Sequence, residues 1–342
     1  MDVAGAVGVT GRADTPALRT LSVWSVLDDA YLTLHVAAMG FTLVLPLLGA
    51  ALSGSPVTPA RAGMLLAIGA SFHVFAYALN DVCDLPLDRR EPQRADDPLV
   101  RGLISPGAVF ALAMAQLPVM ALLVGWSGGG RQQAFWLAVG VAGLAAYDRW
   151  GKACPWPVLT DAVQAFGWAA LLACGATSIT PRVTIAAAGV VAYILLVNGI
   201  IGPVRDLEND HACGARTTAL WLGARARDGG VVLPARAAMY AAITHGTFVA
   251  TVVWLAWPAP VVAQLVVAGL LLLGTWILCF VAPAALRDRR RLPRLGATYI
   301  GTTLGALVLA GGSAVPAPLP FALLLAFGVP VGLMCVRNGR RW

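Results

Sequence analysis

The chain has 342 residues, of which 58% are hydrophobic and only 12% are charged, and its mean hydropathy is +0.76. Soluble proteins carry about twice that share of charged residues, so the composition excludes an ordinary soluble domain and indicates an integral membrane protein. The net charge is +7, but no patch combines aromatic with basic residues, so we expect no nucleic-acid partner. The six cysteines are scattered singly, which excludes a CxxC zinc site.

Ten hydrophobic stretches are long enough to cross a bilayer as helices. They lie near 28–52, 60–82, 107–126, 132–149, 157–178, 183–204, 235–257, 259–283, 295–313 and 317–336. We therefore predict an all-α, multi-spanning transmembrane helical bundle of nine to ten helices. The prediction is a single integral membrane domain over residues 1–342, with a polar N-terminal segment at 1–25 and loops at 80–106 and 205–234.

Basic residues test this map, because Lys and Arg accumulate in cytoplasmic loops. All of them except Arg61, Arg131 and Arg182 fall in alternate connections or in the terminal segments. This asymmetry predicts a multi-pass protein of the cytoplasmic membrane with both termini and the two long loops on the cytoplasmic side. The positive net charge then reflects orientation and attraction to anionic lipid.

The second span ends in a cluster of acidic residues that begins at Asn80. Asp81, Asp84 and Asp88 are spaced i, i+3 and i+7, so they share one helix face if the helix continues through them. Like charges on one face repel each other, and hard divalent cations with oxygen ligands compensate such clusters well. The spacing therefore predicts metal-binding carboxylates.

A second acidic cluster follows the sixth span, where Asp206 and Asp210 form an i, i+4 pair. Each cluster follows the second helix of a four-helix set, helices one to four and then five to eight, which suggests two pseudo-repeated sets. Two facing carboxylate clusters fit Mg²⁺ ions that keep several waters and bind through substrate phosphates. We expect Asp81, Asp84, Asp88, Asp206 and Asp210 to hold Mg²⁺ at a diphosphate.

Basic side chains accompany both clusters. Arg94 and Arg101 follow the first, Arg216 follows the second, and Lys152, the sole lysine, ends the fourth span. Cations beside a metal-bound diphosphate would neutralise it as it leaves, so the expected chemistry is heterolysis of a carbon–oxygen bond. An isoprenoid cation could be stabilised by aromatic faces, for which we consider Tyr147, Trp150, Phe72, Phe75, Phe166 and Trp168.

These motifs resemble the UbiA superfamily of intramembrane prenyltransferases. The resemblance rests on Asn80-Asp81-x-x-Asp84-x-x-x-Asp88, on Gly102 with Ser105, and on Arg205-Asp206-x-x-x-Asp210-x-x-x-Gly214-x-Arg216-Thr217. It implies a helical bundle with two Mg²⁺ ions at a prenyl diphosphate. The five aspartates match the family's metal ligands, and Asn80, Arg94, Lys152 and Arg216 match its diphosphate-contacting positions. With Tyr147, these four are our candidate catalytic residues, and Arg101 is a further candidate for binding the diphosphate.

Two departures from the family pattern bear on the acceptor. Where the family has Arg-Pro-Leu after the first motif, this chain has Asp97-Pro98-Leu99. Members that accept aromatic acids carry Arg and Lys-Pro near the first helix, where this chain reads Leu27-Asp-Asp-Ala-Tyr31-Leu-Thr-Leu-His35. The leading hypothesis is transfer of a prenyl group to a lipophilic, aromatic acceptor. The departures favour the alternative, a terpene cyclase.

Other interpretations are kept open. A secondary transporter would place its charges near the bilayer midplane, and an acidic loop can simply be solvated. We interpret His35 and His73 as hydrogen-bonded core residues inside helices. Asp161, near the start of the fifth span, could be a general base, but we favour a carboxylate at the helix N-terminus.

Overall fold

The computed structural model describes residues 23–54, 56–91, 94–228, 230–281, 286–287, 292–312, 323 and 325–330. Its helical elements are α1 (Val23–Thr33), α2 (Val36–Leu52), α3 (Pro59–Asp88), α4 (Pro106–Trp126), α5 (Gly130–Trp150), α6 (Pro157–Gly175), α7 (Pro181–Leu196), η2 (Val197–Ile201), α8 (Gly202–Ala212), α9 (Thr218–Trp221), α10 (Ala235–Ala256), α11 (Val261–Trp276), η3 (Ile277–Val281) and α13 (Leu292–Gly312). Strands β1 (Arg225–Arg227) and β2 (Gly230–Val232) form an antiparallel hairpin. The segments η2 and η3 are π-helical.

Three of the long helices begin in the same way. Thr58, Ser105 and Thr180 are the N-cap residues of α3, α4 and α7, and each is followed by proline. The cap hydroxyl accepts a hydrogen bond from the backbone N–H three residues on, at 3.2 Å in every case. A proline in this first position has no N–H to leave unpaired, so the Thr/Ser-Pro pairs set the helix starts.

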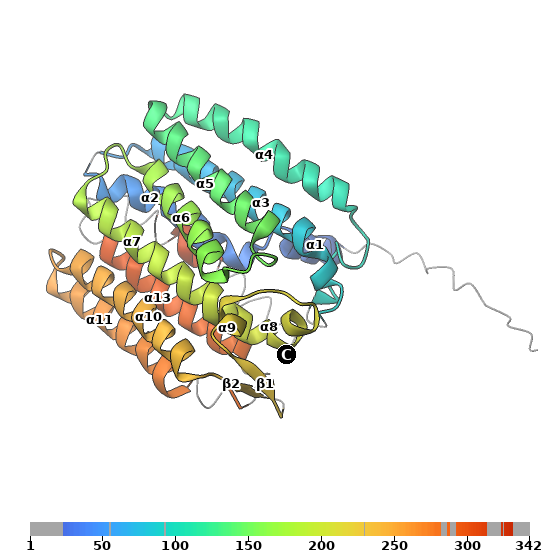
Figure 1. Ribbon diagram of the computed structural model, residues 1–342. Coiled ribbons are helices and arrows are strands. Elements are labelled where there is room, and N and C mark those ends of the chain that lie inside the picture. The colour runs from blue at the N-terminus through green and yellow to red at the C-terminus, as the bar shows by residue number, and fades with distance from the viewer. Residues whose placement is uncertain are drawn as a thin grey trace, which may run out of the picture.

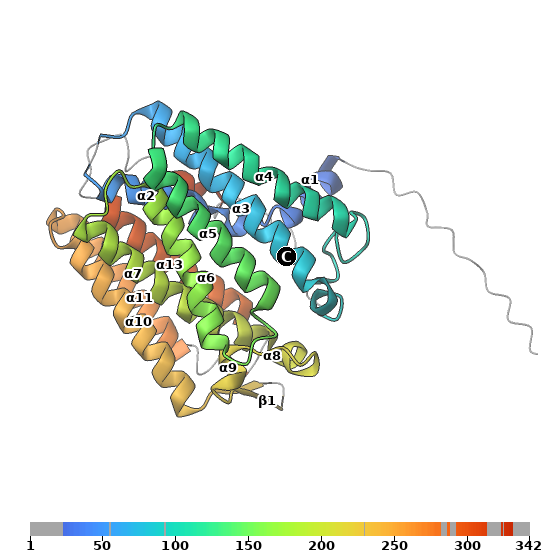
Figure 2. The same cartoon turned by 45° about the horizontal axis from the view of Figure 1, so that its top comes forward.

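The long helices form a closed circuit of neighbours (Figures 1 and 2). Contacts run from α2 to α3, from α3 to α5, from α5 to α6, and on through α7, α10, α11 and α13 back to α2. Helix α2 also packs on α6, where Gly49 and Gly175 face backbone carbonyls so closely that any side chain would clash. The side chains of Val44, Leu45, Leu47 and Leu48 are fully buried, so α2 is enclosed by the bundle.

Seven helical stretches in the described residues are long and apolar enough to cross a membrane. They confirm the predicted helical membrane bundle, with differences in detail. Helix α5 is as long as several of these seven stretches but is more polar. The apolar part of α2, Ala38–Leu52, is shorter than a full membrane span. The predicted span 28–52 is wrong as one helix, because it breaks at His35, which has a positive φ of 46°. The tenth predicted span lies mostly outside the described residues.

Both acidic motifs lie on helices. Helix α3 continues through Asp88, so the connection predicted at 80–106 begins only after that residue. Similarly, α7, η2 and α8 form one helical run from Pro181 to Ala212, which places Asp206 and Asp210 on α8 rather than in a loop. In Figure 1, α8, α9 and the β1–β2 hairpin lie together at one end of the bundle.

Candidate functional site

The first motif forms a row of carboxylates at the end of α3, and each is close to a nitrogen donor. Asp84 Oδ2 accepts hydrogen bonds from Lys152 Nζ at 2.8 Å and from Asn80 Nδ2 at 3.1 Å. Asp88 lies 3.9 Å from Arg94 Nε. Asp81 is 4% exposed, and its two oxygens lie 2.8 and 3.0 Å from His35 Nε2.

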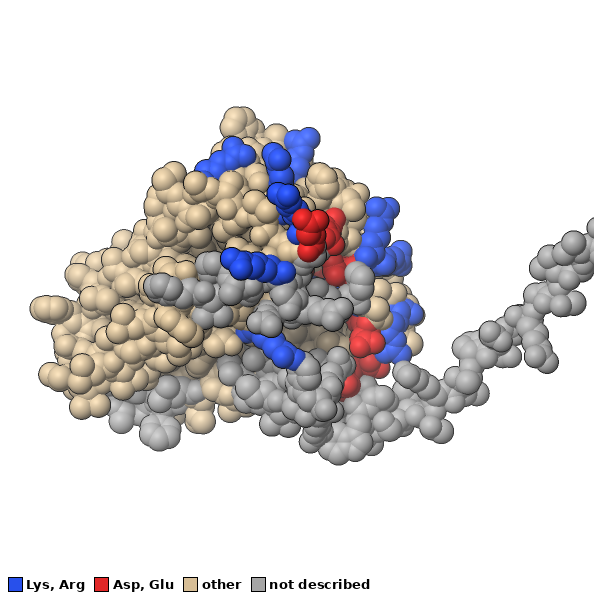
Figure 3. Space-filling view, turned by 90° about the horizontal axis from the view of Figure 1, so that it is seen from below, with Lys and Arg blue, Asp and Glu red and all other residues tan. Residues whose placement is uncertain are grey.

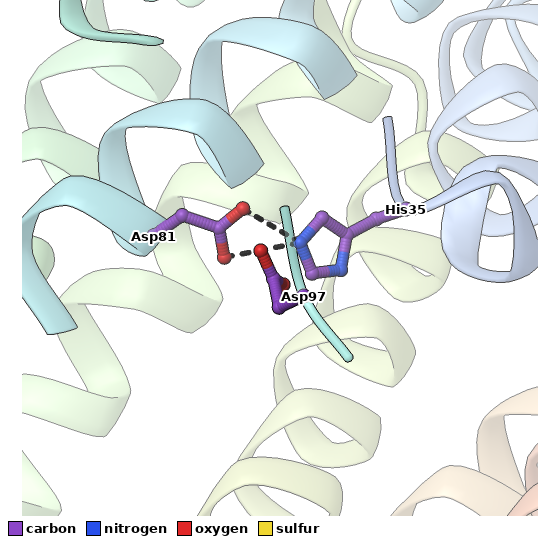
Figure 4. Close-up of side chains that lie close together, drawn as sticks. All are labelled: His35, Asp81 and Asp97. Carbon is purple, nitrogen blue, oxygen red and sulfur yellow. Dashed lines mark hydrogen bonds and ion pairs between the residues drawn. The ribbon is translucent and has the colours of Figure 1, made fainter. Parts of the chain in front are cut away.

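His35 reaches Asp81 because the chain breaks between α1 and α2 (Figure 4). The imidazole is stacked on Tyr77, one turn before Asp81 on α3, with ring centroids 4.9 Å apart. Asp97 joins them from the connection after α3, so that one ligand atom from each of His35, Asp81 and Asp97 lies within 4.8 Å of the other two. The carboxylate that stands in place of the family's arginine therefore adds negative charge at motif one.

The second motif is brought to the first by contacts between α8 and the end of α3. Asn209 Nδ2 donates a hydrogen bond to the Leu87 carbonyl at 3.3 Å. Asp210 is 5% exposed, whereas Asp206 is bonded to its neighbour Arg205 at 2.7 Å. One amide side chain of motif two thus holds the two acidic helices together.

The connection between α5 and α6 completes the site. The backbone N–H of Arg216 donates to the Lys152 carbonyl at 2.9 Å, which joins this connection to the segment after α8. Burial lowers the pKa of the Lys152 ammonium, but the Asp84 carboxylate, assisted by Asp210 and Asp88, more than offsets this and raises the pKa above its ordinary value. Lys152 therefore remains a cation between the two motifs.

Charged side chains gather along one side of the molecule (Figure 3). Lysine and arginine residues surround the aspartates and glutamates there, and much of the visible face is uncharged. The carboxylates of the acidic motifs pair with Lys152, Arg94 and Arg205, so these motifs form a polar end of an otherwise apolar bundle.

Several predicted site residues have a different environment from the one expected. Arg101 forms an ion pair with Asp29 of α1 at 3.3 Å rather than with motif one. The side chain of Arg216 is exposed, so only its backbone contacts the site. Trp150 and Phe166 are 60% and 61% exposed on the outside of the bundle, so their assignment to the site interior is wrong.

Three of the remaining aromatic candidates form a buried cluster. Phe72, Phe75 and Trp168 are nearly inaccessible, and Tyr147 is half-buried beside Asp148. Trp168 contacts Phe72 and Phe41 edge to face, with ring centroids 5.6 and 5.2 Å apart. Hydropathy alone did not separate these residues from those on the outer surface, because both groups lie in apolar spans.

Three charged or titratable residues escaped the sequence prediction of the site. Asp148 Oδ1 accepts a hydrogen bond from Asn80 Nδ2 at 3.1 Å, and its Oδ2 is buried without a partner. His35 and Asp97 are the other two. The signal for Asp148 was its position as an ionisable residue at the end of an apolar span, which by itself makes a residue a functional candidate.

The two histidines differ from each other. His73 is fully buried and bonded to Thr42 and to the Leu34 carbonyl, which confirms the expectation of a core histidine. His35 lies at a helix break and contacts a motif carboxylate, so the same expectation is wrong for it.

The family model of the UbiA prenyltransferase family matches residues 39–299. The chain belongs to this family. No curated protein matches it.

Solved structures of UbiA homologues share the fold. The apo structure of a homologue from Aeropyrum pernix K1 is 20% identical, with a TM-score of 0.57, and the match covers 79% of this chain and 97% of that one. Structures of a homologue from Archaeoglobus fulgidus, bound to GPP and Mg²⁺ or to DMAPP and Mg²⁺, are 17% identical with TM-scores of 0.56. Those matches cover 82% of this chain and 99% of the homologue.

Proposed function

We propose that this UbiA-family protein ionises a prenyl diphosphate in a Mg²⁺-dependent reaction at the polar end of its membrane-embedded bundle, and transfers the prenyl group to a lipophilic, aromatic acceptor. The observation that carries the proposal is the meeting of the two carboxylate helices, α3 and α8, through Asn209 and Leu87. Lys152 lies between them. The proposal is supported by the GPP and DMAPP bound with Mg²⁺ in the Archaeoglobus fulgidus homologue.

The residues present fit magnesium. Every predicted ligand supplies carboxylate oxygen, which hard divalent cations prefer, and the buried Oδ2 of Asp148 has no partner. Asp81, Asp84, Asp88, Asp206 and Asp210 would hold the ions, with Asp148 beside them. Bound Mg²⁺ would neutralise negative charge on the diphosphate as the carbon–oxygen bond breaks.

The chain's own cations have complementary tasks. Lys152 forms an ion pair with Asp84, and Arg94 forms one with Asp88. If metal took those carboxylates, the two cations would be in position to bind diphosphate oxygens. The amide nitrogen of Asn80 donates hydrogen bonds to both Asp84 and Asp148 and so fixes the two carboxylates relative to each other. Tyr147, next to Asp148, would face the reacting end of the prenyl chain. Arg216 and Arg101 lie farther from the motif carboxylates and would attract the diphosphate over a longer range.

A terpene cyclase is the second candidate, and a specific observation favours it. Aromatic rings follow one another from the motif into the bundle: Tyr77 contacts Trp168, Trp168 contacts Phe41, and Phe41 contacts Tyr193, with centroids 5.2 to 6.4 Å apart. Such rings stabilise cations within reach of their faces. Among the described residues from Val23 to Leu52, His35 is the only basic side chain, and Asp81 already binds it. A carboxylate-bearing acceptor would therefore find no free cation there.

The test is incubation of the purified protein with Mg²⁺ and prenyl diphosphates of several lengths, with and without a lipophilic aromatic acceptor. Released diphosphate and organic products are measured by mass spectrometry. Transfer predicts turnover only with the acceptor, and cyclisation predicts a cyclic hydrocarbon or alcohol without it. Both should be lost in Asp81→Ala and Asp206→Ala. Absence of diphosphate release from the wild-type protein under every condition would overturn both candidates.

We also propose that the polar end faces the cytoplasm. The proposal is supported by the sequence, in which Lys and Arg concentrate in alternate connections and in the terminal segments. Figure 3 shows charged side chains gathered along one side of the molecule. A single cysteine introduced at the exposed hairpin residue Asp228, in a background without native cysteines, should react with an impermeant thiol reagent only after the membrane is opened. Labelling in intact cells would reverse the assignment.

A further inference from the structure

Asp161 is a deeply buried carboxylate that neither motif includes. It lies on the second turn of α6, beyond the first turn, so our interpretation as a helix N-terminal carboxylate is wrong. The residue is 4% exposed, and its Oδ2 accepts a hydrogen bond from Thr218 Oγ1 at 2.6 Å. Within the described residues it forms no ion pair, in contrast to Asp81, Asp84 and Asp206. Burying an uncompensated carboxylate is costly, which favours a functional reason for its presence.

The face of α6 that carries Asp161 points into the bundle. Asp161, Gln164 and Trp168 are spaced i, i+3 and i+7, and all three are buried. Gln164 accepts a hydrogen bond from Asn198 of η2, and Trp168 belongs to the aromatic cluster. One interior stripe therefore leads from the aromatic rings, past an amide pair, to the Asp161 carboxylate.

Asp161 is also tied to the diphosphate end of the site. Thr218 follows Arg216 by two residues, and the Arg216 backbone is bonded to the Lys152 carbonyl. The π-helical η2 also passes directly against the carboxylate. A Cβ atom at Gly199 would lie 3.3 Å from Asp161 Oδ2 and 3.2 Å from the Tyr240 hydroxyl. Departures from α-helical geometry of this kind often mark functional positions.

We propose that Asp161 is the general base that accepts the proton released at the end of the reaction, with Thr218 as the residue that positions it. The proposal rests on the proposed prenyl-diphosphate chemistry. The diphosphate leaves with the electron pair of the carbon–oxygen bond. A π bond of the acceptor ring, or of the prenyl chain itself, gives its electron pair to the new carbon–carbon bond, which leaves the positive charge on the other carbon of that π bond. The adjacent C–H bond then gives its electron pair to a C=C bond and its proton to the Asp161 oxygen that Thr218 leaves free.

The same proton transfer to Asp161 applies whether the C–H bond belongs to an acceptor ring or to a cyclised chain. Thr218 donates to one carboxylate oxygen and so fixes the direction of the other. The proposed base is a different residue from the proposed metal-binding carboxylates, whose oxygens are needed at the leaving group.

The test compares the full-length wild-type protein with Asp161→Asn in the turnover condition established above. Two quantities are measured in the same reaction, the released diphosphate and the deprotonated product. In Asp161→Asn we expect the ratio of product to diphosphate to fall at least about tenfold, with a prenyl alcohol from capture of the cation by water making up the difference. Asp161→Glu should restore part of the ratio. The matched control is Asp228→Asn, an exposed hairpin residue, which should keep the wild-type ratio.

The ratio does not depend on how much protein is folded, so it separates a chemical role from a structural one. An unchanged ratio in Asp161→Asn would overturn the proposal. Should that variant release no diphosphate, the ratio in Thr218→Val decides: a fall supports the proposal and an unchanged value overturns it. Absence of diphosphate release from the wild-type protein is a different result, because it contradicts the proposed function itself.

Discussion

Lys152→Met removes the cation that occupies Asp84 and leaves a side chain of similar length. The ammonium lies 2.8 Å from Asp84 Oδ2, and the two side chains are 31% and 13% exposed. Exposed ion pairs contribute about 0.2–1 kcal/mol, and removing one partner of a buried pair costs about 3–5 kcal/mol. This pair lies between these limits, so the substitution should cost the metal-free protein about 2 kcal/mol.

The same pair determines the expected effect on magnesium. In the proposed site the ion must displace the ammonium from Asp84, and in the variant that displacement no longer takes place. The affinity for Mg²⁺ without substrate should therefore rise, by about 30-fold if the full 2 kcal/mol is recovered. Diphosphate release should instead fall about 100-fold or more, because a cation facing the leaving group is lost. Tighter metal binding together with slower chemistry is the signature of this arrangement.

The assay is calorimetric titration of the detergent-solubilised protein with Mg²⁺, followed by diphosphate release at saturating metal. Lys152→Arg is the matched control, because it keeps a charge near Asp84 and should retain metal affinity close to wild type. Weaker Mg²⁺ binding by Lys152→Met would refute the reasoning, since it would mean that Lys152 supports the ion rather than competing with it.

Two further substitutions test the same end of the bundle. Asp148→Asn keeps an acceptor for Asn80 but replaces the buried, unpartnered Oδ2, so Mg²⁺ affinity should fall. Unchanged affinity would exclude Asp148 from the metal site. His35→Gly tolerates the positive φ but leaves buried Asp81 without its partner, at a cost of about 1–3 kcal/mol that saturating Mg²⁺ should largely remove. An equal loss of stability with and without the ion would contradict a metal role for Asp81.

Much of the bundle could be predicted because apolar runs, Thr/Ser-Pro pairs and acidic spacing are local signals. The break at His35 could not. No glycine or proline stands there, and the interrupted backbone is stabilised by distant residues: His73 donates a hydrogen bond to the Leu34 carbonyl just after α1, and Asp81 binds the His35 ring. Only the contacts of α3 with α2 and with Leu34 and His35 make the positive φ acceptable, and a single sequence carries no local sign of those contacts.

The acidic motifs could be predicted for a different reason. Their i, i+3, i+4 and i+7 spacing fixes a common face once a helix is assumed, and α3 and α8 confirm the helix. Which aromatic residues face inward was not fixed in this way. Phe166 and Trp168 are two residues apart on α6, so they point in different directions, and only the positions of α2, α5 and α7 decide that Trp168 is the buried one.

The ion pairs suggest how metal and substrate binding are coupled. Asp81, Asp84, Asp88 and Asp206 each contact a basic side chain of the same chain, and in the proposed site that side chain would be released if metal took the carboxylate. A released cation and a bound ion both attract the diphosphate, so each ligand should strengthen the binding of the other by the same factor. In the proposed site, the carboxylates without their paired cations would bind metal even when no substrate is present. The paired cations would lower the affinity for metal, so that the site fills with metal only in the complex with diphosphate.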